Sequence, residues 1–492
     1  MRATSAATDE PEYPDEVSSF PSSQPRTQTQ MELGFSTLQW LRLLPPLSLC
    51  ILLFSYLCTS LWLRPARLRR KLRSQGVKGP KPSFLFGNIP EMRKIQKQLV
   101  GSEQEQEGAK DGFSSNYVAT LFPYFLHWSR VYDPDMVKEI ANCKSLDIGK
   151  PLYLQKELGA LLGMGILTSN GDLWAHQRKV IAPEFFMEKV KGMVHLMIEA
   201  ANRMLISWEN KVEKEGGSAE MVVDESLRSF SADVISRASF GSNFSEGKEI
   251  FNKIRQLQKA MAKQNMLIGV PGSRYGAKAD PFSSCTPEDF IVDNCKNIYF
   301  AGHETTSTTA AWCLMLLASH PKWQSCARAE VLDVCQGNTL NADMLKKLKT
   351  VTMVIQETFR LYPPAAFVTR EALNDIKLGS LNIPKGTNIR IPIALAHRDP
   401  AIWGPSSDRF DPARFANGIA GACKPPHMYM PFGVGTRTCA GQNLAMVELK
   451  VVLSLVLSRF EFALSPKYVH CPAFRLTIEP GNGMPLILKK LS

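Results

Sequence analysis

An uncharged apolar run near the N-terminus constrains this 492-residue chain more than any other feature. Residues 43–63 read LLPPLSLCILLFSYLCTSLWL, and as a helix they span about 31 Å, enough to cross the hydrocarbon core of a bilayer. The next ten residues, 64–73, are mostly Arg and Lys, and positive charge beside an apolar span favours the cytosolic side. We therefore predict an uncleaved transmembrane anchor with the bulk of the chain in the cytosol. A buried core helix is the alternative.

The segments around this run indicate how the chain is divided. Residues 1–42 begin with a stretch rich in Ser, Thr, Pro and Gln, so we expect a disordered lumenal segment. Residues 64–82 are basic and end in Gly79-Pro80-Lys81-Pro82, which stops a helix and is typical of a stiff linker. We assign residues 83–492 to one large domain, because no internal repeat and no second domain is visible.

Cysteine usage and charge narrow the class of protein. The 11 cysteines are scattered without CxxC or CxxCH, which argues against structural zinc, thioredoxin chemistry and covalent haem attachment. Such a set favours reduced thiols facing the cytosol. We assign much of the net charge of +12 to contact with the membrane surface, since no pattern typical of nucleic-acid recognition accompanies it.

The rest of the chain predicts a mainly helical body with small β-sheets. Most of residues 135–362 has helical periodicity, with long periodic segments at 188–215 and 223–264. Short alternating stretches at 365–395 and 472–490 contain Pro and Gly and indicate small strands and turns.

The clearest predicted helix covers residues 289–318. It is apolar at both ends, yet seven polar residues from His303 to Thr309 follow one another at its middle. A solvated stripe would recur every three or four residues, whereas this run clusters, and buried polar groups are costly unless they are paired or needed. Zinc binding by HExxH is excluded because position 307 is Ser.

A second cluster surrounds one cysteine. Residues 431–441 read PFGVGTRTCAG, a glycine-rich loop that enters a predicted helix at residue 442. A cysteine just before a helix N-terminus is favoured as thiolate, and Arg437 adds a cation suited to a carboxylate. Thr438 stands where a phosphate-binding GxGxxG needs Gly. Taken alone, this loop is also compatible with a purely structural Cys439.

The loop resembles the haem-binding loop of the cytochrome P450 family at every fixed position. These positions are Phe432, Gly433, Gly435, Arg437, Cys439 and Gly441. Four further motifs of that family follow in the right order between residues 174 and 441. They are Trp174-x-x-x-Arg178, Ala301-Gly302-His303-Glu304-Thr305-Thr306, Glu357-x-x-Arg360 and Pro412-Ala413-Arg414-Phe415. Alone, Glu357 and Arg360 would suggest only a surface ion pair.

The resemblance implies a cytochrome P450 fold in a single domain and a haem b cofactor, with Cys439 as the thiolate ligand of the iron. Gly302 would leave room for dioxygen, and Glu304 and Thr305 would be the catalytic residues that deliver protons. The remaining implied haem-binding residues are Trp174, Arg178, Arg370, His397, Phe432, Arg437 and Gly441, of which Arg178, Arg370, His397 and Arg437 are candidates to hold the propionates. The ion-paired group Glu357, Arg360 and Arg414 would brace the loop of Cys439.

The resemblance also implies partners and a location. Since the chain has no flavin or nicotinamide fingerprint, electrons would come from an NADPH-dependent reductase in the endoplasmic reticulum membrane. After residue 31 the chain looks most like plant microsomal members that oxidise gibberellins, which are tetracyclic diterpenoid acids. The implied substrate pocket is lined by small apolar groups, which suit a rigid terpenoid and also many other hydrophobic substrates. Its candidate residues are Ala301, Gly302, Ala365, Ala366, Phe367, Val368 and, more loosely, the turn near Gly483.

Two departures from the family pattern stand out. Tyr132 runs straight into Asp133-Pro134, which leaves no room for the β-hairpin that relatives have there. Residues 276–290 are too short for the helices that normally cover the active site. We expect both segments to be missing, which would remove sheet hydrogen bonds and open the pocket to water.

Three functions remain open. The first is a membrane-anchored monooxygenase that acts on a lipophilic substrate, dioxygen and reductase. The second is a haem isomerase or dehydratase that needs no dioxygen, against which the proton-delivering pair Glu304 and Thr305 argues. The third is a truncated, inactive haem-binding variant.

Overall fold

The computed structural model describes residues 46–84, 86–103, 117–128, 134–241, 256 and 286–491. The chain divides into two compact units, Met1–Pro65 and Ala66–Ser492. In the first unit residues 46–58 are helical, the π-helix η1 (Thr59–Leu63) follows, and apolar side chains such as Phe54 are exposed. Within these described ranges, no helix is both long enough and apolar enough to cross a membrane. The predicted lumenal segment, 1–42, lies outside them.

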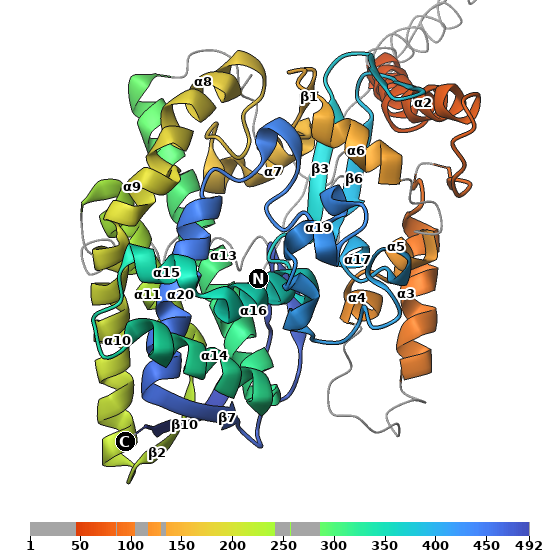
Figure 1. Cartoon of the computed structure of the whole chain (residues 1–492). Helices are drawn as coiled ribbons and strands as arrows, with labels where there is room; N and C mark the ends of the chain where they lie inside the picture. Colours follow the sequence, from red (N-terminus) through yellow and green to blue (C-terminus); the bar gives the residue numbers. More distant parts are fainter. Residues whose placement is uncertain are drawn as a thin grey trace, which may run out of the picture. The chain divides into compact units, whose positions relative to one another are not determined.

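The second unit is mainly helical, as the sequence predicts, and Figure 1 shows its elements. The α-helices before the glycine-rich loop are α2 (Arg64–Arg73), α3 (Ile89–Glu103), α4 (Tyr117–Leu121), α5 (Pro123–Trp128), α6 (Pro134–Asn142), α7 (Leu152–Leu162), α8 (Gly171–Ile181), α9 (Met187–Gly192), α10 (Val194–Lys214), α11 (Asp224–Phe240), α13 (Pro287–Ser319), α14 (Pro321–Cys335), α15 (Ala342–Lys347), α16 (Lys349–Leu361), α17 (Ile393–Ala396), α18 (Pro400–Trp403) and α19 (Gly418–Ala422). The loop is followed by α20 (Gln442–Arg459), and the short 3-10 helices are η3 (Ala182–Phe185), η5 (Pro412–Phe415), η6 (Pro426–Met428) and η7 (Gly435–Arg437).

The strands form small antiparallel sheets. They are β1 (Ile148–Gly149), β2 (Ser218–Val222), β3 (Phe367–Ala372), β4 (Ile376–Leu378), β5 (Leu381–Ile383), β6 (Asn388–Pro392), β7 (Phe460–Leu464), β8 (Pro472–Arg475), β9 (Thr477–Pro480) and β10 (Pro485–Lys490). One sheet has the order β1-β3-β6 and another the order β2-β10-β7, while β4-β5 and β8-β9 are two-stranded. In the β3–β6 pair Val368 faces Ile391.

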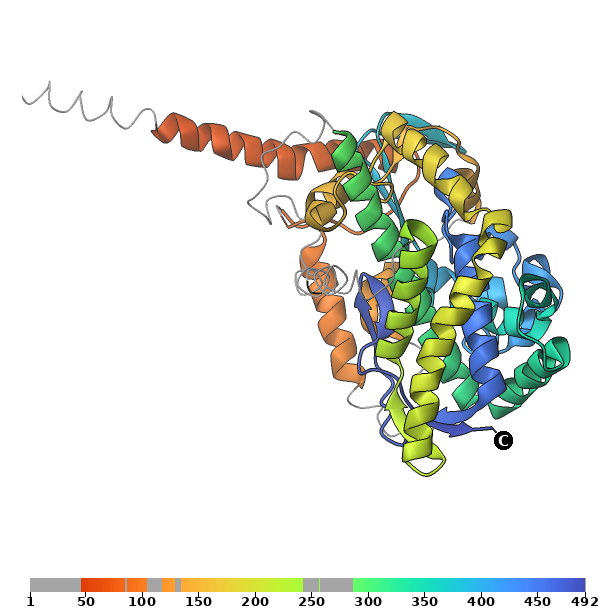
Figure 2. The same ribbon diagram turned by 90° about the vertical axis from the view of Figure 1, so that its left-hand side faces the viewer.

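Helix α13 lies at the centre of the unit and packs against α11, α16 and α20 (Figure 2). It begins with a capping box, in which Thr286 and Asp289 each satisfy the other's main-chain N–H, and it ends before Pro321, which cannot continue a helix. Its second half is almost entirely buried, from Thr306 to Ala318. This helix therefore runs its polar middle through the core, beside α20, the helix that follows Cys439.

Most sequence-based expectations for the elements are confirmed. The strands predicted at 365–395 and 472–490 are present, and 188–215 forms α9 and α10. The segment predicted at 223–264 begins with α11, which ends before Gly241 in the left-handed conformation (φ 69°), a helix stop typical of glycine; residues 242–255 and 257–264 lie outside the described residues. The positions of both expected deletions, 132–133 and most of 276–290, also lie outside them.

Candidate active site

The glycine-rich loop holds Cys439 between η7 and α20. The Cys439 N–H donates to the Phe432 carbonyl at 2.9 Å, and the Thr438 hydroxyl donates to the Gly435 carbonyl at 2.7 Å. Gly435 has a φ of 74°, and a Cβ atom there would lie 3.0 Å from the carbonyl oxygen of Ala141. The close approach of α6 and the left-handed backbone therefore both require glycine at 435.

The sulfur of Cys439 opens onto a cavity while most of its surroundings are protein. Burial raises the pKa of the thiol, and the Gly441 N–H and the positive charge of Arg178 partly oppose that rise. The thiolate expected from the sequence therefore depends on more than the helix N-terminus: in the metal-free protein burial outweighs these two groups, and a bound cation would be needed to hold the sulfur deprotonated.

The cavity has a volume of about 440 Å³ and lies between the loop, α13 and the segment before β3. Its floor consists of loop residues, among them Phe432, Gly433, Cys439 and Gly441. Opposite them lie Ala301, Gly302 and Thr305 of α13. A flat ligand bound here would have sulfur on one side and small residues on the other.

Four cations line this cavity, and no carboxylate among the described residues does. They are Lys150, Arg178, Arg370 and Arg437. Burial, together with the neighbouring arginines Arg370 and Arg437, lowers the pKa of Lys150 to about 7. Burial also lowers the pKa of Arg370 to about 10 and that of Arg437 to about 9. A cluster of like charges in a low-dielectric wall favours an anionic ligand.

Main-chain carbonyls orient the three arginines. Arg178 donates to Thr438 O at 2.7 Å, and Arg370 donates to Val434 O at 3.1 Å, so both grip the cysteine loop. Arg437 donates to Ser169 O at 3.1 Å, and its guanidinium lies 4.1 Å from the centre of the Trp174 ring. The structure thus brings all three predicted arginines and Trp174 together.

Sequence reasoning missed the fourth cation, Lys150. Its side chain makes no hydrogen bond or ion pair within the described residues, while Asn170 bonds its main chain. Lys150 follows β1 directly, so the pairing of β1 with β3 delivers it to the cavity. That pairing spans more than 200 residues, and nothing local in Gly149-Lys150-Pro151 predicts it.

The proposed proton-delivering residues point in different directions. Thr305 lines the cavity, and its hydroxyl donates to Ala301 O one helical turn back at 2.8 Å. Glu304 is fully buried but does not line the cavity. Its Oε1 lies 3.7 Å from Arg228 Nε on α11, and its Oε2 lies 3.4 Å from His303 Nε2.

Gly302 serves helix packing as well as the cavity. A Cβ atom on it would lie 2.5 Å from Ile235 Cγ1 and 3.2 Å from Ile235 Cβ. The close approach of α11 to α13 therefore requires glycine here, a reason that the sequence alone did not suggest.

The apolar wall agrees in part with the predicted substrate pocket. Ala301, Ala365, Phe367 and Val368 line the cavity, whereas Ala366 is buried away from it. In place of the turn at Gly483, the tip of the β8–β9 hairpin contributes Leu476 and Thr477. Leu476 has a φ of 73°, in the left-handed region that a branched side chain rarely adopts.

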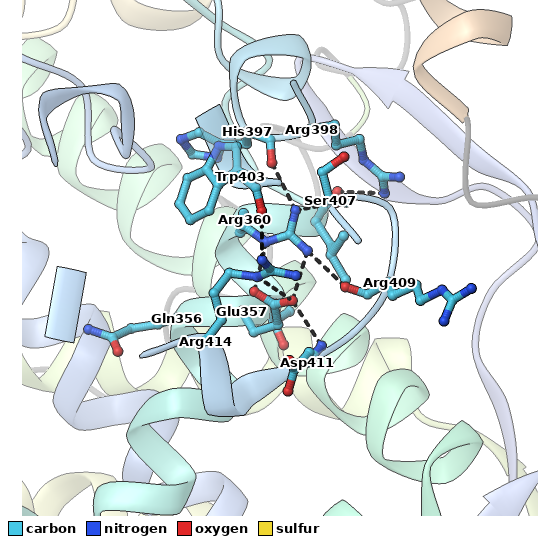
Figure 3. A network of polar contacts seen from close by, with 12 residues as sticks. Gln356, Glu357, Arg360, His397, Arg398, Trp403, Ser407, Arg409, Asp411 and Arg414 are labelled. Carbon is cyan, nitrogen blue, oxygen red and sulfur yellow. Dashed lines mark hydrogen bonds and ion pairs between the residues drawn. The ribbon is translucent and has the colours of Figure 1, made fainter. Parts of the chain in front are cut away.

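Glu357, Arg360 and Arg414 form one buried network (Figure 3). Arg360 binds both carboxylate oxygens of Glu357 at 2.7 Å, with neither side chain exposed, and Arg414 Nε lies 3.7 Å from Glu357 Oε1. The two arginines donate onward to main-chain carbonyls between positions 397 and 409. Those acceptors are His397, Trp403, Ser406, Ser407 and Arg409. This network fixes the segment that leads to the cysteine loop.

His397 belongs to this network and does not reach the cavity. It is fully buried, stacks on Tyr429, and its Nε2 accepts the N–H of Met430 at 2.9 Å. Burial and the nearby Arg360 lower the pKa of His397 to about 3, so the ring is neutral. The structure therefore places His397 as the link between Arg360 and the start of the cysteine loop, away from the arginines expected to share its role.

Residues 77–271 and 277–484 match the sequence model of the family described as Cytochrome P450. The chain belongs to the cytochrome P450 family. It is 71% identical to cytochrome P450 714C2 of Oryza sativa subsp. japonica, over 94% of this chain and 100% of that relative. It is 42% identical to cytochrome P450 714A2 of Arabidopsis thaliana, over 85% of this chain and 92% of that protein.

Solved cytochrome P450 structures share the fold. The heme domain of cytochrome P450DA superposes with a TM-score of 0.59 at 24% identity, over 73% of this chain and 86% of that one. A six-coordinated cytochrome P450 from Thermus thermophilus gives 0.56 at 23% identity, over 75% of this chain and 98% of that one. These likenesses confirm a mainly helical cytochrome P450 fold with small sheets.

Haem is the cofactor of this family, and the residues here fit it. Cys439 offers sulfur to an iron, and the cationic wall without carboxylates suits two propionates. When bound, haem supplies the binding and reductive activation of dioxygen. The chain's own residues hold it, order the groups beside it and shape the space for substrate.

Proposed function

We propose that this cytochrome P450 monooxygenase oxidises a gibberellin or a related diterpenoid in the endoplasmic reticulum membrane. The overall reaction is RH + O₂ + NADPH + H⁺ → ROH + H₂O + NADP⁺. The observation that carries the proposal is one cavity in which Cys439, the cationic wall and Thr305 face the same space.

The residues divide the work by position. When haem is bound, Cys439 would ligate the iron, while Arg178, Arg370 and Arg437, together with Lys150, would bind the propionates. Thr305 holds a proton at Oγ1 inside the cavity, and Glu304 supplies protons from the buried side of α13. The network of Glu357, Arg360 and Arg414, with His397, keeps the cysteine loop in register.

The apolar wall supports a rigid lipophilic substrate. Ala301, Ala365, Phe367, Val368 and Leu476 present no charge, so the substrate is oriented mainly by shape. The choice of gibberellins rests on the sequence resemblance to plant microsomal members that oxidise them. The 71% identity to the rice relative supports grouping this chain with plant cytochromes P450.

The proposed partner is an NADPH-dependent reductase, because the family needs a redox partner and this chain carries no flavin or nicotinamide motif. The apolar run at 43–63 and the basic residues after it support a single anchor with the catalytic domain in the cytosol.

The carbon-monoxide difference spectrum of the reduced protein tests the site. We expect a thiolate-type band, absent in Cys439→Ser; a protein without that band contradicts the proposal and favours an inactive variant. Microsomes with reductase, NADPH and gibberellins then test the reaction. Product that requires NADPH supports a monooxygenase, whereas turnover without NADPH indicates an isomerase or dehydratase.

A further inference from the structure

Arg228 on α11 stands between two buried carboxylates from different elements. Its Nη2 donates to Glu479 Oε2 at 3.1 Å, and its Nε lies 3.7 Å from Glu304 Oε1. Glu304 and Glu479 are both almost completely buried, and Arg228 is 13% exposed. The Nε of Arg228 is buried and makes no hydrogen bond within the described residues. Arg228 is thus hydrogen-bonded to Glu479, whereas its distance to Glu304 is slightly longer than a hydrogen bond.

Glu479 connects this charge cluster to the substrate cavity. It belongs to β9, and the two residues at the hairpin tip, Leu476 and Thr477, line the cavity. Arg475 on β8 binds the other oxygen of Glu479 at 2.8 Å, so both ends of the tip converge on one carboxylate. The cavity-lining tip is thus linked to Glu479 both through strand β9 and through the side chain of Arg475.

One residue of the hairpin tip has a strained backbone. Leu476 is in the left-handed region, and such strained residues persist only where their surroundings enforce them. Behind the tip, Ile478 is fixed, since its N–H donates to Pro364 O and its carbonyl accepts Trp312 Nε1–H at 2.9 Å. The main chain between the tip and Glu479 is therefore anchored, and the side chain of Arg475, the neighbour of Leu476, provides the second connection between them.

From this geometry we infer that Arg228 and Glu479 are positioning residues which couple occupation of the substrate cavity to proton delivery by Glu304. In the structure the charge of Arg228 attracts the Glu304 carboxylate to the α11 side, outside the cavity. When substrate shifts the hairpin tip, Glu479 takes Arg228 more completely, and Glu304 then turns toward Thr305. The inference rests on the proposed monooxygenase function and adds a control that links substrate to proton supply.

Two substitutions have opposite effects under this inference. In Glu479→Gln, Arg228 loses its competing carboxylate and holds Glu304 more firmly, so protons arrive late. In Arg228→Gln, Glu304 keeps the contact of its Oε2 with His303 but loses the nearby charge of Arg228, so protons arrive early even without substrate. A purely structural role would move both variants in the same direction.

The products of substrate-free NADPH oxidation report proton supply. Reduced dioxygen leaves as peroxide, by O₂ + NADPH + H⁺ → H₂O₂ + NADP⁺, or as water, by O₂ + 2 NADPH + 2 H⁺ → 2 H₂O + 2 NADP⁺, and prompt protonation favours water. With reductase and no added substrate, we expect the peroxide released per NADPH to rise about threefold in Glu479→Gln and to fall about threefold in Arg228→Gln. The matched control is Arg237→Gln, because Arg237 lies on the same helix but pairs with Glu199 at the surface.

Infrared spectroscopy gives a second readout that needs no turnover. Arg228→Gln leaves Glu304 beside less positive charge, whereas Arg475 still faces Glu479, so we expect a protonated carboxyl band that the wild type lacks, separate from that of Glu448, whose pKa burial raises to about 8. That band should vanish in the Arg228→Gln/Glu304→Gln double variant. A band that vanishes instead with Glu479→Gln contradicts the inference.

The outcomes separate the two proposals. A wild-type protein without a carbon-monoxide band overturns the proposed function and this inference together. If wild type and both variants keep the band, but the peroxide yields shift in the same direction or not at all, only the inference is overturned.

Discussion

At the residue scale, Lys150 shows how one side chain depends on the bound cofactor. Burial and two arginines lower the pKa of Lys150 to about 7, so the charged lysine destabilises the haem-free fold. This destabilisation is complete below pH 7 and fades as the pH rises toward the unfolded pKa of about 10.4. We expect Lys150→Met to raise the unfolding free energy of haem-free protein by about 1–2 kcal/mol at pH 6, and by less at pH 9. Urea unfolding of both proteins at pH 6 and at pH 9 measures this difference in unfolding free energy.

In the haem-loaded protein we expect Lys150 to be stabilising instead. A propionate beside Lys150 restores the charged ammonium, so Lys150→Met should release haem to an acceptor protein about tenfold faster than wild type at pH 7. Lys81→Met, in the linker away from the cavity, is the control. Equal release rates for all three proteins would mean that Lys150 does not contact the haem.

Other single residues mark the limit of prediction from sequence. Cys439, Arg178, Arg437 and Thr305 could be identified because local motifs carry them, whereas Arg370 was implied by the family resemblance alone; all five line the cavity. The motif containing Glu304 could not show that the carboxylate faces Arg228, because α11 lies about 70 residues earlier. The sequence around His397 likewise does not indicate that its ring accepts the N–H of Met430 rather than contacting haem.

At the scale of elements, the packing of α11 on α13 is set by one glycine. Since a Cβ on Gly302 would lie 2.5 Å from Ile235 Cγ1, Gly302→Ala should destabilise the protein by about 1–3 kcal/mol. Gly159→Ala, within α7 and with open space around it, should instead stabilise by about 0.5–1 kcal/mol. Thermal unfolding of both variants, and of Gly302→Ala with Ile235→Ala, measures the contact. Failure of the second substitution to recover stability would place the strain elsewhere.

The helices were more predictable than the sheets, for a physical reason. Helix α13 carries its capping box, its apolar ends and its terminating proline within one stretch of sequence. Strands β2 and β7 are five residues each and exist because both pair with β10, which is distant in sequence from β2. No local pattern records such a pairing, and neither strand was predicted.

The network centred on Glu357 ties α16 to the segment between α17 and the cysteine loop. Glu357→Gln keeps the shape but removes the charge that balances the fully buried Arg360, and we expect a loss of about 3–5 kcal/mol with reduced haem content. Glu184→Gln, which breaks an exposed pair with Lys189, should cost less than about 1 kcal/mol. Haem content and denaturant unfolding are measured for both variants. Equal losses of stability would show that the buried network contributes no more than an exposed ion pair.

At the scale of the whole molecule, part of the rice relative has no counterpart in this chain, which concerns the two segments expected to be missing. The alignment with the rice relative runs over 524 positions, although only 94% of this 492-residue chain takes part, so positions of the relative lack a counterpart here. The match to the family leaves out residues 272–276, which include Gly276, and runs without interruption across residues 132–133. Restoring the relative's residues after Tyr132 and at Gly276 should add sheet hydrogen bonds and cover the cavity, and so raise Tm by about 3–5 °C and lower peroxide release. Gly/Ser inserts of the same lengths are the control, because they restore length without pairing or apolar surface. If these inserts match the relative's segments in Tm and peroxide yield, the chain folds and excludes water without those segments, and the two expected deletions do not limit its activity.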